Sequence, residues 1–137
     1  MKLKFRTPTT AGILMLLLGL TGCGDDDPRS SVSGTVTLNG ERLTGGEIVF
    51  VPVNPRLASE SARIDDGRYT MRVAPGEKQV VIRAERDHPT AQMPGPDPGT
   101  MIPLREQFIP KRYNDNTELT AEVVQGANKF DFELEAE

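Results

Sequence analysis

Residues 32–40 read Val-Ser-Gly-Thr-Val-Thr-Leu-Asn-Gly. Apolar or small residues alternate with Ser and Thr. Because successive side chains of a β-strand point to opposite faces, this pattern is typical of a half-buried strand. Asn39 and Gly40 end the pattern, and both tolerate a positive φ, so they favour a tight turn. The stretch therefore predicts a strand that leads directly into a reversal of the chain.

The same period of two recurs along the rest of the chain. Residues 46–53 are apolar on both faces, which predicts a central strand. Asp-Asp-Gly at 65–67 lies between two alternating segments and is a strong hairpin signal. The predicted strands cover residues 32–38, 46–53, 61–64, 68–73, 77–84, 119–123 and 130–134.

The last of these segments alternates aromatic and charged residues. We expect Phe130 and Phe132 to be buried and Asp131 to face solvent, where its removal would have little effect. Seven short strands in about 105 residues predict an all-β fold, a seven-stranded antiparallel Greek-key sandwich of prealbumin or immunoglobulin-like type. The 13 Gly and 11 Pro agree with this fold class, since both residues favour turns over long helices.

The N-terminal segment has the features of a secretion signal. Lys2, Lys4 and Arg6 precede an apolar run over residues 11–20, which suits a signal peptide and is too short to cross a bilayer. The run ends in Leu-Thr-Gly-Cys, which resembles the lipobox of bacterial lipoproteins. That resemblance implies cleavage before Cys23 and a diacylglyceryl group on its thiol. The alternative is a plain secretory signal followed by a chance cysteine.

Cleavage at the lipobox would divide the chain into three parts. We expect residues 1–22 to be a lipoprotein signal peptide, residues 23–31 a lipidated polar tether, and residues 32–137 the β-sandwich domain. A cysteine with two or three acyl chains is held stably by a bilayer. We therefore expect an extracytoplasmic domain that is lipid-anchored to the bacterial cell membrane or outer membrane.

The charge and the scarcity of His and Cys exclude several classes of function. Removal of the signal peptide leaves 13 basic and 20 acidic residues, a net charge of −7, which argues against nucleic-acid binding. One Cys and one His cannot form a disulfide framework or a Cys/His zinc site within one chain. No cofactor or metal is expected beyond the covalent lipid on Cys23.

Several motifs resemble those of one family of domains. They consist of structural glycines, turn residues and core positions, and they lie at residues 32–40, 46–52, 65–69 and 108–114. In these motifs the chain from 31 to 135 is similar to the carboxypeptidase regulatory-like (transthyretin-like) domain, which recurs in small bacterial lipoproteins of unassigned function. The resemblance implies the sandwich fold and gives only weak evidence about activity. One departure is Lys78, where the family often has an aromatic residue.

His88 is the one imidazole available for catalysis. A Ser-His-Asp arrangement would need an acid to orient it and a serine beside it, and an adjacent residue such as Asp87 rarely has that geometry. The hydrolases and iron dioxygenases that share the transthyretin-like fold use more than one His, so the resemblance carries over neither activity. The sequence therefore predicts that the protein is not an enzyme.

Residues 85–112 hold six of the eleven prolines and are predicted to form a long loop. Its first part is rich in Pro and Gly, whereas its second part is apolar enough to dock on the domain. In one interpretation, Phe108 and Ile109 cover the outer face of the strand that carries Val49 and Val51. In the other, the loop contacts a partner or ligand. The candidate contact residues are then His88, Phe108 and Tyr113.

These observations favour a membrane-anchored, non-catalytic β-sandwich lipoprotein that serves as an interaction or structural module of the cell envelope. Its expected partners are the membrane, through the lipid, and an unidentified envelope protein or ligand, with no nucleic acid. One alternative is an extracytoplasmic binding protein for a small ligand or carbohydrate, for which Tyr113 is the aromatic candidate. A less favoured alternative is an unrecognised hydrolase.

Overall fold

The structure, a computed structural model, describes residues 27–136. The predicted signal peptide and Cys23 lie outside the described residues. Within them the regular structure is β, apart from one turn of 3-10 helix, η1 (Lys111–Tyr113). The strands are β1 (Ser30–Leu38), β2 (Glu41–Arg42), β3 (Gly45–Pro52), β4 (Glu60–Asp65), β5 (Arg68–Val73), β6 (Gly76–Arg83), β7 (Glu85–Pro94), β8 (Met101–Gln107), β9 (Thr120–Val123), β10 (Ala127–Lys129) and β11 (Phe132–Leu134).

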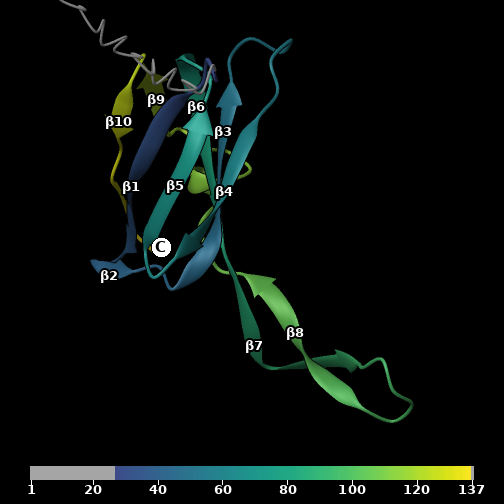
Figure 1. The fold of residues 1–137 in the computed structure, drawn as a ribbon. Coiled ribbons are helices and arrows are strands. Elements are labelled where there is room, and N and C mark those ends of the chain that lie inside the picture. The colour runs from purple at the N-terminus through teal and green to yellow at the C-terminus, as the bar shows by residue number, and fades with distance from the viewer. Residues whose placement is uncertain (1–26, 137) are drawn as a thin grey trace, which may run out of the picture.

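Nine strands form one curled sheet that makes the body of the molecule (Figure 1). The strand order is β10-β1-β5-β4-β3-β6-β9, with β2 and β11 also paired to β1. Between β4 and β5 the ladder is reduced to the single pair Asp65↔Arg68, and there the sheet folds over. Phe50 of β3 consequently meets Tyr69 of β5 across the interior, with ring centroids 6.3 Å apart.

The seven predicted segments all contain strands, but the pairing differs from an all-antiparallel arrangement. The last predicted segment contains β11, and the additional strand β10 precedes it; both run parallel to β1, with Ser31 opposite Ala127 and Val36 opposite Phe132. All other ladders in the described part of the chain are antiparallel. The domain also begins earlier than predicted, because Ser30 and Ser31, assigned to the tether, already pair with β5.

The core lies between the two halves of the folded sheet. Val32 and Val36 of β1 are fully buried, as the alternation at 32–38 predicts, and Ile48 and Phe50 of β3 face them from the other half. Phe132 is buried as expected, whereas Phe130 is half-buried and packs on Phe50 at 6.2 Å. The aliphatic core with few aromatic rings follows directly from the composition.

Gly34 permits the close approach of the C-terminal segment to β1. A Cβ at this position would lie 1.7 Å from the carbonyl oxygen of Phe130. The same oxygen accepts a 2.8 Å hydrogen bond from the hydroxyl of Tyr69, and the backbone N–H of Phe130 donates to the carbonyl of Ser33 at 3.0 Å. Burial raises the pKa of Tyr69. Gly34, Tyr69 and Phe130 thus join β1, β5 and the C-terminal segment at one point.

Asp131 has a role that its exposed position does not indicate. Its Oδ1 accepts hydrogen bonds from the backbone N–H of Thr35 at 2.8 Å and from the Thr35 hydroxyl at 2.9 Å. These hydrogen bonds, with Lys129 nearby, lower the pKa of Asp131. Asp131 is exposed as predicted, but its side chain bonds β1 at the break between β10 and β11, so we expect its removal to destabilise the domain.

Candidate functional site

Residues 85–112 were expected to form a loop, and the structure instead contains a two-stranded antiparallel hairpin there, β7–β8. The hairpin projects from the body (Figure 1). Glu85 pairs with Gln107 at its root and Pro94 with Met101 near its tip, with an irregularity between Asp87 and Gln92. The loop prediction was wrong because the prolines argued against strands in two segments whose backbones nevertheless pair.

The tip and the root of the hairpin are both hydrogen-bonded. At the tip, the N–H of Gly95 donates to the carbonyl of Thr100 at 2.8 Å. At the root, the side-chain Oε1 of Gln107 accepts the N–H groups of Ala84 and Ile109 at 3.0 and 3.2 Å. The hairpin is therefore an ordered extension of β6 rather than a flexible connection.

Ile109 fastens the hairpin to the body. It is buried in the core, and Phe108 is half-buried against the same cluster. Val49 and Val51 do not belong to that cluster. The expectation that Phe108 and Ile109 cover the outer face of the β3 strand is therefore wrong, because the two residues pack toward the interior at the end of the sheet.

The root of the hairpin carries an ordered set of charges. Nε of Arg86 lies 2.8 Å from Oε1 of Glu106, and the Arg86 guanidinium carbon lies 5.2 Å from the centre of the Phe108 ring. Nε of Arg105 lies 3.9 Å from Glu85 and 3.7 Å from Asp87. These exposed pairs fix the orientation of the hairpin root more than they stabilise the fold.

His88 lies on β7, and one of its ring nitrogens is hydrogen-bonded to the backbone. Nδ1 accepts the backbone N–H groups of Thr90 at 3.2 Å and Ala91 at 2.9 Å, while Nε2 faces Oε2 of Glu106 at 3.8 Å. A catalytic histidine needs one nitrogen for an orienting acid and the other for the nucleophile. In this arrangement Nδ1 is bonded to the backbone, so it is not available to an orienting acid or to a serine.

Apolar side chains are exposed along the outer part of the hairpin. Seven large hydrophobic residues are exposed among residues 27–136, and four of them lie here, with exposed fractions of 41% to 55%. Met93 and Ile102 are directly paired across the strands, and Leu104, two residues from Ile102, shares their face. Met101 lies on the opposite face. Exposed apolar residues that cluster in this way mark interaction surfaces more often than isolated ones do.

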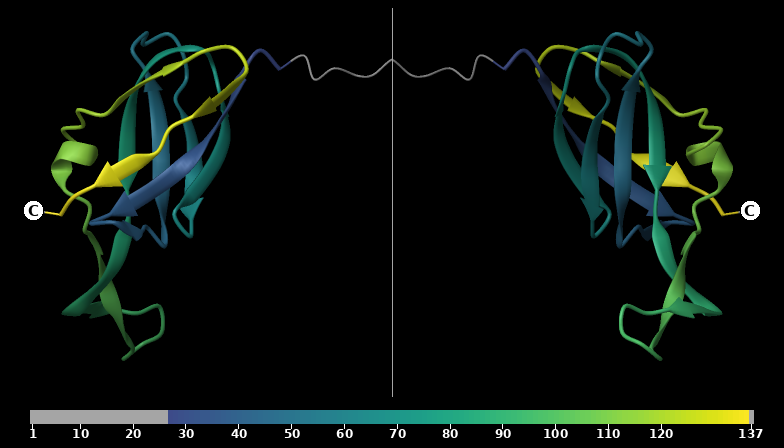
Figure 2. Two further views of the ribbon diagram at one scale, coloured as in Figure 1. Left: turned by 90° about the vertical axis from the view of Figure 1, so that its left-hand side faces the viewer. Right: turned by 90° about the vertical axis from the view of Figure 1, so that its right-hand side faces the viewer.

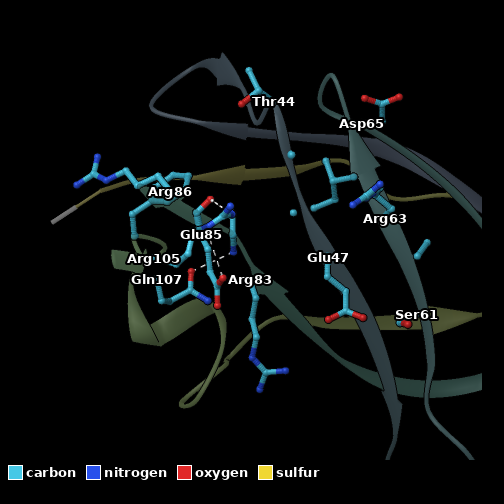
Figure 3. A pocket seen from close by; sticks show the side chains of 16 residues that line it. Thr44, Glu47, Ser61, Arg63, Asp65, Arg83, Glu85, Arg86, Arg105 and Gln107 are labelled. Atoms are coloured by element: carbon cyan, nitrogen blue, oxygen red, sulfur yellow. Dashed lines mark hydrogen bonds and ion pairs between the residues drawn. The ribbon is translucent and has the colours of Figure 1, made fainter. Parts of the chain in front are cut away.

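An open pocket lies where the hairpin meets the body (Figure 3). It has a volume of about 1060 Å³ and is lined by the ends of β3, β4 and β6 and by the hairpin root. Glu47 of β3 stands between Arg63 of β4 and Arg83 of β6 in the sheet register. Within the described chain neither arginine has an acidic partner within 4 Å. The carboxylates of Glu47, Asp65 and Glu85 line the same pocket, so it carries charges of both signs next to the apolar hairpin.

Tyr113 does not join this site. It lies in η1, and its hydroxyl accepts the backbone N–H of Glu135 at 3.1 Å. Arg112 covers its ring at 5.0 Å and donates to the carbonyl of Glu135 at 2.8 Å. Of the three predicted contact residues, His88 and Phe108 thus share the hairpin, whereas Tyr113 holds the C-terminal strand.

Sequence reasoning identified the apolar second part of this segment but expected it to dock on the domain, whereas Met101, Ile102 and Leu104 are exposed, and it missed the arginines of the pocket. The alternation of Ile102 and Leu104 was a usable signal for a strand, but Pro103 between them obscured it. Nothing in the sequence distinguished Arg63 and Arg83 as site residues, since each lies on a strand face that is ordinarily solvated. Residues 27–136 contain no group of three or more His, Cys, Asp or Glu arranged to hold a metal ion. No helix in that range has the length and apolar character to span a bilayer.

Comparison with known proteins gives limited information. A scan against protein-family models finds no match, and a search of curated proteins finds none either. Similar solved structures include a DUF3823 family protein from Parabacteroides merdae, at 18% identity and a TM-score of 0.41, over 79% of this chain and 46% of that one. A candidate adhesin from Bacteroides ovatus has 19% identity and a TM-score of 0.47, over 85% and 49%.

A 9R-lipoxygenase from Cyanothece has 11% identity and a TM-score of 0.40, over 95% of this chain and 18% of that one. The chain thus spans less than half the length of each of these three structures. At such low TM-scores the function must be argued from the chain's own residues.

Proposed function

We propose that the protein is a lipid-anchored, non-catalytic module of the bacterial cell envelope, with a domain of the carboxypeptidase regulatory-like type. Its role is to bind a partner through the β7–β8 hairpin. The observation that carries this proposal is the group of four exposed apolar side chains on an element that extends outside the core. Such exposure is unfavourable in an isolated domain and becomes favourable once a partner covers it.

The anchor is supported by the N-terminal sequence and by the position of the first strand. Seven residues lead from Cys23 to Ser30, where β1 begins, and they span at most about 25 Å. Acyl chains contribute about 0.8 kcal/mol per buried CH₂, so two or three chains hold a protein stably at a bilayer. The domain is then presented close to the membrane outside the cytoplasm.

The absence of catalysis is supported by the surroundings of His88. Its Nδ1 is bonded to two backbone N–H groups and its Nε2 faces Glu106, so it resembles a structural residue of the hairpin bend. A small-ligand function has one favourable observation, the pocket that contains Arg63 and Arg83. Guanidinium groups bind carboxylates and phosphates, so the ligand in that case would place an anionic group at Arg63 and Arg83, beside the carboxylates of Glu47, Asp65 and Glu85.

The anchor is tested by the mature protein and by one variant. Wild-type protein isolated from its own cells should have an N-terminal Cys23 with the added mass of acyl chains, and it should partition into the detergent phase. Cys23→Ala should remain uncleaved or move to the aqueous phase. An acyl-free Cys23 in the wild type would disprove the anchor and favour a plain secretory signal.

A further inference from the structure

A single titratable side chain, that of His88, holds the bend of the β7–β8 hairpin. We infer that His88 is a pH-sensitive switch: the neutral ring fixes the direction of the outer half of the hairpin, and the protonated ring releases it. The switch itself does not depend on the proposed function. Its use, which is to present the exposed apolar residues in one direction or to release them, rests on the proposed function of the hairpin.

The hairpin bends where its two strands have unequal numbers of residues. Residues 88–91 of β7 lie opposite the single residue Leu104 of β8. A bulge of this kind leaves backbone groups without ladder partners and bends the strand. The hairpin changes direction at this point (Figure 1). Three of its exposed apolar side chains, Met93, Met101 and Ile102, lie beyond the bend, so the bulge sets their direction relative to the body.

The imidazole of His88 supplies the hydrogen-bond acceptor that the bulge lacks. Its Nδ1 accepts the backbone N–H groups of Thr90 at 3.2 Å and Ala91 at 2.9 Å, two residues that have no ladder partner in the described chain. Pro89 follows His88 and keeps its backbone extended, because a proline disfavours the helical region for the residue before it. One ring nitrogen therefore holds two backbone donors of the bulge.

The two protonation states of the ring are compatible with different arrangements of the bend. A ring nitrogen that accepts hydrogen bonds has no proton, so the proton of the neutral ring is on Nε2, which faces Oε2 of Glu106 at 3.8 Å. A second proton must enter at Nδ1, which then becomes a donor and can no longer accept from Thr90 and Ala91. The added positive charge also strengthens the attraction to Glu106. Protonation therefore removes both bonds of the bulge and leaves the ring beside β8.

His88 is also placed to gain and lose that proton. Its side chain is 33% exposed, so water reaches the ring. The hairpin is a two-stranded sheet of its own, so β8 is the element packed against β7. Asp97 is in the tip turn, and the other charged side chains of the hairpin lie at the root: Glu85, Arg86, Asp87, Arg105 and Glu106.

These root charges already engage one another. Arg86 pairs with Glu106 at 2.8 Å, and Arg105 lies 3.9 Å from Glu85 and 3.7 Å from Asp87. Histidine is the side chain whose charge ordinarily changes between about pH 5 and 8, and the chain contains one. A change of the bend in that interval can therefore be assigned to His88.

The outer half of the hairpin has room to change direction. Both views of Figure 2 show it clear of the body, at the end of the molecule opposite to the start of β1. The root is fastened separately, by the side chain of Gln107 and by Ile109 in the core. The tip has its own hydrogen bond, from Gly95 to Thr100. Release of the bulge therefore moves the tip as a unit and leaves the root in place.

The test is amide hydrogen exchange of the whole mature protein, isolated from its own cells in detergent and followed by NMR. Each exchange rate is divided by the intrinsic rate of that amide at the same pH, which gives its protection. Between about pH 8 and pH 5 the protection of Thr90 and Ala91 should fall about tenfold, the effect of losing a hydrogen bond. The fall should follow the titration of His88, read from the nitrogen shifts of its ring. Gly95, whose N–H donates to a backbone carbonyl, should keep its protection.

Two variants distinguish a switch from a residue that only supports the bend. Asn in turns accepts backbone N–H groups a few residues further along the chain, and its amide takes up no proton, so His88→Asn should keep the two amides protected at both pH values. His88→Ala lacks the acceptor and should leave them unprotected at both. The amide of Val36, which donates to Gly67 in the body at 2.8 Å, should stay protected in every variant and so confirms that each is folded.

Three results would overturn the inference: a neutral ring with its proton on Nδ1, equal protection of Thr90 and Ala91 at the two pH values, or a His88→Asn variant with the pH dependence of the wild type. None of these measurements involves a partner. The proposed function is tested separately, by the acyl chains on Cys23 and by capture of a partner in intact cells, so a failure of the switch is distinguished from a failure of the proposed function.

Discussion

The ammonium group of Lys78 lies 3.5 Å from Oε2 of Glu60 in the interior of the folded sheet. Lys78 is 1% exposed and lies on the face of β6 that also carries Val80 and Ile82. Glu60, at the start of β4, accepts the backbone N–H of Ala74 through its other oxygen at 3.0 Å. An ion pair therefore occupies a position in the interior of the folded sheet, beside the apolar side chains of β6.

Removal of one partner of this pair should destabilise the protein strongly. Lys78→Met leaves the Glu60 carboxylate half-enclosed without its counter-ion, and breaking a buried pair in this way costs about 3–5 kcal/mol. Lys78→Met combined with Glu60→Gln removes both charges and keeps the acceptor for Ala74. The double variant should therefore recover most of the loss, which urea denaturation would measure. Two independent, additive losses would mean that Lys78 and Glu60 do not interact.

Gly34 should not tolerate a side chain, because its Cβ would overlap the carbonyl oxygen of Phe130. Gly34→Ala must displace the C-terminal segment and break the hydrogen bond from Tyr69 to that oxygen, and we expect a loss of about 3 kcal/mol. Gly45→Ala is the control, since nothing lies within 4 Å of its Cβ, and it should change the unfolding free energy by less than about 0.5 kcal/mol. Equal melting temperatures for the two variants would contradict the packing at β1.

Asp131 should make the stability depend on pH in the acid range. Its pKa in the folded protein is lowered by the hydrogen bonds from Thr35, whereas in the unfolded chain it stays near the ordinary value of about 3.9. Its contribution is therefore fully present above about pH 4 and is lost as the pH falls through the lowered folded-state pKa.

Asp131→Asn keeps the shape of the side chain and removes the charge. We expect it to melt at a lower temperature than the wild type at pH 7, and the difference should shrink steadily below pH 4. Glu133→Gln, an exposed change on β11, is the control and should melt like the wild type at both pH values. A difference between Asp131→Asn and wild type that is independent of pH would show that the charge is unimportant.

The body of the fold could be predicted because alternation reports directly which side chains are buried. Val32, Val36 and Phe132 all lie where the period of two places them. The hairpin could not be predicted in this way, since its strands are exposed on both faces and interrupted by prolines. Where neither face of a strand is buried, the sequence has no reason to alternate apolar and polar residues, so the pattern does not identify the strand.

The remaining features depend on contacts between distant residues. Asp131 bonds Thr35 and Lys78 meets Glu60, partners that are 96 and 18 positions apart. The parallel pairing of β1 with the C-terminal strands is likewise a long-range property. A single sequence shows each residue type but not its partner, so the hydrogen bonds of Asp131 with Thr35 and the pairing of Lys78 with Glu60 could not be predicted.

The central claim is that the β7–β8 hairpin serves binding and not folding. The most direct measurement replaces residues 88–104 with Asn-Gly, which keeps the root from Glu85 to Asp87 and the anchoring Gln107 and Ile109. The melting temperature of this variant should lie within about 2 °C of the wild type, because the deleted residues contribute nothing to the core and a shorter loop is slightly easier to close. In the same cells its crosslinks to the envelope partner, formed by a reagent that reacts at surface lysines of the body, should disappear. A variant that unfolds, or one that keeps the partner, would contradict the account.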